Sequence, residues 1–196
     1  TELNRILTEA AAENDEALME LYFEKGVLTQ DELRSGLKLG LAKRDLIPVF
    51  CASGKRDIGA KRLMEFIINV APGPLKAPNF VTVDGREIEP DSNGPTALFV
   101  FKTTVEPHLG EVTYFRVVSG KVTEGMELVN SKTGNKEKIS QLFAVAGKNR
   151  VKVTEMMAGD IGCTVKLKGT RTNQTLSTPG SNIEIDPIRF PEPRYR

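Results

Sequence analysis

The sequence predicts an α/β segment followed by an all-β antiparallel barrel, and three observations indicate this division. Apolar residues recur at helical spacing over residues 3–24, 29–42 and 59–70. From Ala97 onward the pattern changes to short β-branched or aromatic runs separated by glycines. Between the two patterns, prolines and glycines crowd residues 71–96 and the helical period disappears.

The first segment combines helices with one expected strand. Gly26 is suited to end the first helix, and Thr29 with Glu32 makes the capping-box pattern that begins the second. Residues 46–51, Leu-Ile-Pro-Val-Phe-Cys, are a short apolar run that is typical of a buried strand in a parallel sheet. A loop and the helix over 59–70 follow. This order is that of α/β folds, and a single strand with three helices indicates the end of such a domain.

The second half contains five segments with strand character, namely 97–104, 110–119, 127–130, 138–146 and 161–168. Residues 132–135, Lys-Thr-Gly-Asn, predict a hairpin turn in which Gly134 supplies a positive φ. Short strands at regular spacing favour a closed barrel of six or seven strands, because closure leaves no unpaired edge. The predicted division is residues 1–70, a linker over 71–96, a barrel over 97–178 and a second linker over 179–196.

Composition and charge narrow the classes of function. Of the 196 residues, 39% are apolar and 27% are charged, which is ordinary for a folded protein. The net charge of +1 hides a polarity, because residues 1–33 carry nine acidic and two basic groups, whereas residues 97–178 carry twelve basic and seven acidic groups. We therefore expect any anionic partner at the second half. No apolar stretch is long enough to span a membrane, and two distant cysteines favour a reducing compartment.

Motifs for catalysis and for metal binding are scarce. The Gly-x-x-x-x-Gly-Lys-Ser/Thr phosphate loop is absent, so we expect the chain alone to be inactive toward nucleoside triphosphates. His108 is the single histidine, and Cys51 and Cys163 lie far apart in the sequence. These residues make neither a metal site nor a nucleophile–base pair. We expect no catalytic and no metal-ligating residues in this chain.

Motifs in the first half resemble the GTP-binding domain of elongation factor G. They are residues 9–20, Glu-Ala-Ala-Ala-Glu-Asn-Asp-Glu-Ala-Leu-Met-Glu, residues 28–33, Leu-Thr-Gln-Asp-Glu-Leu, and residues 47–53, Ile-Pro-Val-Phe-Cys-Ala-Ser. In this order they are similar to the last third of that domain. The resemblance implies that residues 1–70 are the C-terminal part of a G domain.

A second set of motifs resembles the β-barrel, called domain II, that follows the G domain in translational GTPases. The set comprises residues 106–110, Glu-Pro-His-Leu-Gly, residues 116–120, Arg-Val-Val-Ser-Gly, and residues 157–162, Met-Ala-Gly-Asp-Ile-Gly. Residues 188–193, Ile-Arg-Phe-Pro-Glu-Pro, are similar to the strand that opens the next domain. The two sets are collinear and cover nearly the whole chain.

The resemblance implies a parent protein that hydrolyses GTP with Mg²⁺ and promotes ribosomal translocation in the cytoplasm. Its partners would be the RNA and proteins of the small ribosomal subunit, whereas the chain itself is expected to be monomeric and to bind no cofactor. Two alternatives stay open. One is a release-factor or ribosome-protection type of translational GTPase. The other is a stand-alone, non-enzymatic RNA-binding barrel module.

The resemblance also implies two sets of site residues. Residues 51–54, Cys-Ala-Ser-Gly, stand at the motif whose backbone N–H groups contact the guanine carbonyl, so Ser53 and Gly54 are the candidates. Gly54 replaces the usual alanine, which keeps the N–H donor but removes a Cβ. On the barrel, the expected RNA-facing cations are Arg116, Lys121, Lys132, Lys136, Lys138, Lys148 and Arg150. The turn over 147–150, which carries two cations, is the favoured contact.

Overall fold

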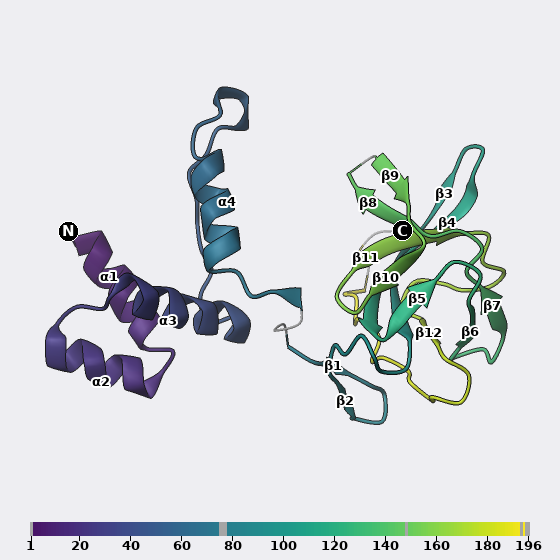
Figure 1. Ribbon diagram of the computed structural model, residues 1–196, viewed down its shortest axis with the longest axis horizontal. Coiled ribbons are helices and arrows are strands. Elements are labelled where there is room, and N and C mark those ends of the chain that lie inside the picture. The colour runs from purple at the N-terminus through teal and green to yellow at the C-terminus, as the bar shows by residue number, and fades with distance from the viewer. Residues whose placement is uncertain (1, 75–77, 148, 193, 195–196) are drawn as a thin grey trace. The chain divides into compact units, whose positions relative to one another are not determined.

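The computed structural model describes the whole chain except residues 1, 75–77, 148, 193 and 195–196 (Figure 1). The chain divides into two compact units, Thr1–Pro78 and Asn79–Arg196. The first unit is helical, and the second is built from antiparallel strands. No helix in the described part of the chain combines the length and apolar character needed to cross a membrane.

The helical unit contains four α-helices and one short 3₁₀ turn. They are α1 (Glu2–Ala12), α2 (Glu16–Lys25), α3 (Gln30–Lys43), η1 (Gly54–Arg56) and α4 (Ala60–Asn69). Their core is formed by buried Ala11, Leu37 and Val70, with Leu33 and Phe66 among the residues packed against it. Gly36 of α3 faces the backbone of Ala11 so closely that a Cβ could not fit there. The missing side chain therefore allows α1 and α3 to approach each other.

Helix caps explain where these helices begin and end. The single helix expected over 3–24 is broken, because Asp15 is extended at φ −150° and its carboxylate accepts a hydrogen bond from the Leu18 N–H at 3.1 Å. Gly26 ends α2 with φ +69°, as predicted. The capping box is also confirmed, since the Thr29 hydroxyl accepts from the Glu32 N–H and the Glu32 carboxylate accepts from the Thr29 N–H.

The strand predicted over residues 46–51 is wrong. The segment belongs to no helix or sheet, and the side chains of Ile47 and Val49 are 84% and 88% exposed. A strand needs a neighbour for its backbone groups. The described residues of the helical unit offer only an isolated bridge between Ser53 and Ile58.

The β unit is centred on one antiparallel sheet with the strand order β7-β6-β12-β3-β4-β11-β8-β9. Its strands are β3 (Ala97–Glu106), β4 (Gly110–Ser119), β6 (Glu127–Asn130), β7 (Lys136–Lys138), β8 (Phe143–Ala146), β9 (Asn149–Lys152), β11 (Ile161–Val165) and β12 (Thr175–Ser177). Two small sheets add to it, which pair β1 (Phe80–Val81) with β2 (Glu87–Ile88) and β5 (Lys121–Thr123) with β10 (Glu155–Met157).

The sheet is not closed into a barrel ring, because β7 and β9 stand at its two ends without pairing to each other. The core nevertheless contains residues from both the large sheet and the β5–β10 pair, including Val122 and Met156. Ile139 and Leu142 are fully buried between β7 and β8. The sequence predicted one strand over 138–146, whereas in the structure β7 ends at Lys138 and β8 begins at Phe143, with these two buried side chains between them.

A second apolar cluster lies beyond the range expected for the barrel. Ile183 and Ile185, both 3% exposed, pack with Phe99 of β3, and Phe80 of β1 packs against the same cluster. Burying an aliphatic side chain of this size contributes about 1.5–3 kcal/mol. Parts of the two predicted linkers, residues 71–96 and 179–196, therefore pack against the β unit.

Candidate functional site

The loop that joins residues 51–54 to α4 is folded back on itself. The Ser53 N–H donates to the Ile58 carbonyl at 2.9 Å, and the Ile58 N–H donates to the Ser53 carbonyl at 3.1 Å. The main-chain N–H of Ser53 is thus already used within the loop. The side chain of Ser53 makes no cap to the η1 turn that follows.

Gly54 occupies a different position from Ser53. It begins the η1 turn, is exposed, and would place a Cβ in open space. Because it is the first residue of a helical turn, its N–H points away from the turn and has no partner within it. Of the two predicted guanine-contacting residues, Ser53 uses its N–H in the hydrogen bond to Ile58, whereas the N–H of Gly54 lies at the exposed start of the turn.

Three of the seven predicted RNA-facing cations lie together on the β6–β7 hairpin. Lys136 and Lys138 are exposed on β7, and Lys132 is exposed in the turn between the strands. Gly134 gives this turn its positive φ of +73°, as the sequence predicted. Glu127 is the cross-strand partner of Lys138, so one exposed acid stands beside three exposed bases.

The Glu137 carboxylate fixes this hairpin to the loop after β11. Glu137 is 3% exposed, and its carboxylate accepts hydrogen bonds from the N–H groups of Lys168 and Gly169, each at 2.9 Å, and from the Thr170 hydroxyl at 3.0 Å. Lys136 and Lys168 line one hollow of about 240 Å³. Sequence reasoning missed Lys168, because its approach to Lys136 depends on this long-range contact.

Arg150 of β9 is turned inward against the β3–β4 hairpin. Its Nη1 donates to Glu106 Oε2 at 2.9 Å, and its Nη2 donates to Glu106 Oε1 and, at 2.8 Å, to the Tyr114 hydroxyl. The side chain is 20% exposed. The hydrogen bonds from Arg150 hold the pKa of the Glu106 carboxyl below its ordinary value, and those bonds raise the pKa of Arg150. The guanidinium is engaged within the protein rather than presented to a partner.

The other predicted cations are scattered. The half-buried Arg116 lies over the Phe80 ring, with its guanidinium carbon 5.1 Å from the ring centre. Lys121 is exposed on β5, which pairs with β10 and not with the large sheet. Lys148 lies outside the described residues, so the favoured 147–150 turn is described only in part.

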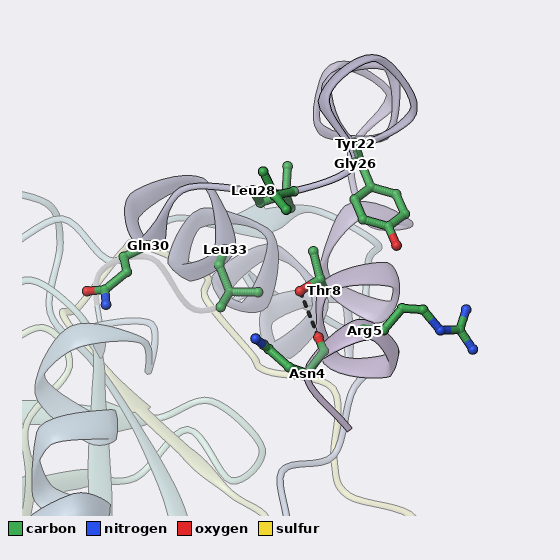
Figure 2. Close-up of a pocket in the computed structure, with 9 residues that line it drawn as sticks. Asn4, Arg5, Thr8, Tyr22, Gly26, Leu28, Gln30 and Leu33 are labelled. Atoms are coloured by element: carbon green, nitrogen blue, oxygen red, sulfur yellow. Dashed lines mark hydrogen bonds between the residues drawn. The ribbon is translucent and has the colours of Figure 1, made fainter. Parts of the chain in front are cut away.

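A hollow of about 420 Å³ lies beside α1 in the helical unit (Figure 2). Its one charged side chain is already paired, since Arg5 bonds to Glu2 and Glu9, and Thr8 Oγ1 donates to the Asn4 carbonyl at 2.8 Å. In Figure 2 the Arg5 guanidinium points away from the other labelled side chains. The hollow therefore gathers no free charge that would bind or activate a substrate.

Metal-binding and nucleophilic groups do not converge in the part of the chain that the structure describes. Those residues contain no group of three or more histidine, cysteine, aspartate or glutamate side chains placed to hold a metal ion. Cys163 is buried, and burial raises the pKa of its thiol, which disfavours the reactive thiolate. Cys51 is exposed.

Comparison with known proteins identifies the β unit. Residues 95–179, which span β3 to β12, match the family described as elongation factor G domain 2. This segment is therefore similar to domain 2 of elongation factor G. The match places the chain in the context of the translational GTPases.

The fold of the whole chain is also similar to a solved structure. A crystal structure of a protein from Thermus thermophilus matches 95% of this chain with a TM-score of 0.71 and 27% sequence identity. The chain spans 26% of the length of that protein. The similarity covers the helical unit as well as the elongation factor G domain 2, so the resemblance to an elongation-factor-G-like chain is confirmed at the level of fold.

Proposed function

We propose that this chain is part of an elongation-factor-G-like translational GTPase that promotes ribosomal translocation. The observation that carries the proposal is the domain 2 match over residues 95–179, supported by the fold similarity over 95% of the chain. In the proposal, the parent protein acts in the cytoplasm, and GTP hydrolysis supplies the energy for its conformational change. In the same proposal, this chain contributes to the binding of one part of the nucleotide, the guanine base.

The helical unit is proposed to be the C-terminal part of the GTP-binding domain. Several large apolar side chains of this unit are exposed, among them Ile47, Val49, Met64 and Ile68, at 84%, 88%, 57% and 75%. Exposed apolar side chains in such number are typical of a surface that another part of a protein covers. The proposal assigns that covering part to the remainder of the GTP-binding domain.

The first test concerns the guanine contact at Gly54. Ser53 is extended at φ −132° and Gly54 is the first residue of a helical turn, which is a position where proline is tolerated. In the longer protein that the proposal implies, Gly54→Pro removes the N–H and should weaken GDP binding about tenfold. Gly54→Ala keeps the N–H and fills open space, so it is the matched control. Equal affinities of the two variants would contradict the contact.

The chain by itself is proposed to hydrolyse no GTP, because it contains no phosphate loop. Phosphate release from GTP by the purified chain, with and without ribosomes, measures this directly. Turnover above the background of the buffer would contradict the proposal.

The second test concerns the ribosome. We place the contact with ribosomal RNA at the β6–β7 hairpin, because Lys132, Lys136 and Lys138 are exposed there and Arg150 is not. Changing the three lysines to glutamine should weaken binding to small ribosomal subunits. It should also flatten the dependence of log Kd on log salt by about two, since each lost phosphate contact removes about 0.7–0.9 from the slope.

The control for the hairpin variant is Lys121→Gln, which removes an exposed cation from another sheet. It should leave the salt dependence of binding nearly unchanged. A salt slope that is the same for the hairpin variant and the unmodified chain would contradict the hairpin assignment. Binding that does not change between low and high salt would contradict phosphate contacts altogether.

A further inference from the structure

Two segments outside the matched domain range are hydrogen-bonded to each other on the β unit. The incoming segment, residues 80–88, contains β1 and β2, and the outgoing segment comprises residues 183–188. The Val83 N–H donates to the Glu184 carbonyl at 2.9 Å, and the Asp186 N–H donates to the Val81 carbonyl at 2.8 Å. These bonds flank an antiparallel bridge between Thr82 and Ile185. The chain that comes into the β unit is thus bonded directly to the chain that leaves it.

Side chains extend this connection along the incoming segment. Arg86 Nη2 donates to the Asn182 carbonyl at 2.9 Å, and Arg86 Nε donates to Asp84 Oδ2 at 2.7 Å. The hydroxyl of Thr82, a residue 3% exposed, accepts from the Arg86 N–H at 2.9 Å. Arg86 therefore holds the incoming hairpin in shape and also ties it to Asn182, the residue directly before the outgoing segment.

The outgoing segment is anchored at both of its ends. The Ser131 hydroxyl donates to the Ile183 carbonyl at 2.6 Å, and the Ile185 N–H donates to Thr175 Oγ1 at 2.9 Å. At the far end, the Asn173 side chain donates to the Ile188 carbonyl at 2.8 Å and accepts from the Ile188 N–H at 3.1 Å.

Each segment has few backbone hydrogen bonds of its own and is supplemented by those to the other. The incoming hairpin has two strands of two residues each, and an isolated two-stranded hairpin is marginal in water. The outgoing segment has one bridge and no strand of its own. Phe80, Ile183 and Ile185 contribute to one apolar cluster, so loss of either segment would expose the side chains of the other.

We propose that residues 80–88 and 183–188 act as one conformational unit, a clasp. The clasp passes a displacement of the chain that comes into the β unit to the chain that leaves it, through the direct hydrogen bonds between the two segments. The inference rests on the contacts of the β unit alone and does not depend on the proposed GTPase activity.

Hydrogen exchange of the full chain tests the clasp from its outgoing side. Asn173→Gly removes both bonds to Ile188, and glycine accommodates the backbone of Asn173 at φ +68°. The clasp predicts roughly tenfold faster exchange at the Thr82 N–H, which is bonded to the Arg86 carbonyl inside the incoming hairpin. Lys166→Gly, at φ +63° and outside both segments, is the matched control and should leave that exchange unchanged.

The reciprocal experiment starts from the incoming side. Arg86→Gln should accelerate exchange at the Ile188 N–H, whose own partner on Asn173 is untouched, whereas Lys152→Gln, which breaks an exposed ion pair to Glu124, should not. Protection of the Val117 N–H, bonded to the Asp160 carbonyl, reports that the fold is intact. Faster exchange on both sides in both variants supports the clasp. Faster exchange confined to the side on which the substitution acts, or no change on either side, would overturn it.

Discussion

Single glycines carry very different constraints in the β unit, and the pair Gly120 and Gly125 shows this. Both have positive φ, at +69° and +86°. A Cβ at Gly120 would meet backbone atoms of Thr96 at 2.7 Å, whereas a Cβ at Gly125 meets nothing within 4 Å. Gly120 is therefore required by close packing as well as by its backbone conformation.

The resulting prediction compares alanine at the two positions. Both substitutions cost about 1–2 kcal/mol for a positive φ, and Gly120→Ala adds an overpacking cost of about 1–3 kcal/mol because backbone atoms cannot move aside easily. Urea unfolding measures the free energy of unfolding of each variant. An equal decrease in the free energy of unfolding for Gly120→Ala and Gly125→Ala would show that the backbone of Thr96 does not exclude a Cβ at residue 120.

The ion pair between Glu106 and Arg150 predicts a pH dependence of stability. Because Arg150 lowers the pKa of the folded Glu106 carboxyl, the stabilisation is complete above its ordinary value of 4.5 and is lost as the pH falls through the lowered value. The melting temperature of Glu106→Gln should lie below that of the unmodified chain at pH 7, and the difference should shrink in acid. Glu111→Gln, which breaks a 3.5 Å pair with Arg171, is the control. A difference that is constant with pH would contradict this coupling.

Arg150 also shows what the sequence cannot reveal about single residues. Arg150 is a cation beside a glycine-containing turn, which is the pattern that predicted an exposed phosphate contact. In the fold, antiparallel pairing of β8 with β9 brings it to Glu106, a residue 44 positions away. The lysines of the β6–β7 hairpin were easier to place, because alternation along β7 turns Glu137 inward and leaves Lys136 and Lys138 outside.

At the level of elements, features that depend on residues close in the sequence were predicted correctly, whereas features that depend on distant segments were not. The capping box at Thr29 and the turn at Gly134 depend on neighbouring residues, and both are confirmed. The strand over 110–119 is found with the predicted bounds, because ten residues give a clear pattern. The strand over 46–51 was wrong, since its formation depends on a neighbouring strand that the described helical unit does not provide.

Short elements escaped prediction for a related reason. Strands β5, β10 and β12 have three residues each, too few to show an alternating pattern. β5 and β10 pair with each other and contribute Val122 and Met156 to the core. The closed barrel was expected from the spacing of the strands alone. In the structure the large sheet stays open, and the separate β5–β10 pair helps to cover the core.

At the scale of the whole molecule, the two units differ in how completely they bury apolar surface. The described β unit has three apolar clusters with several fully buried side chains, including Leu98 and Phe115. The helical unit leaves Leu3, Ile47 and Val49 at least 80% exposed. This contrast supports the proposal that the helical unit belongs to a larger GTP-binding domain, whereas the β unit, which contains the segment similar to elongation factor G domain 2, buries its own core.

The central proposal, translocation, is tested most directly by following messenger RNA on ribosomes that are poised before translocation. The longer protein implied by the proposal is added with GTP, and the position of the ribosome on the messenger is read by primer extension. The account predicts that the ribosome advances by one codon, and that it does not advance when a non-hydrolysable GTP analogue or no protein is supplied over the same short time. GTP hydrolysis without this advance, accompanied by release of an antibiotic or of a termination factor, would contradict it.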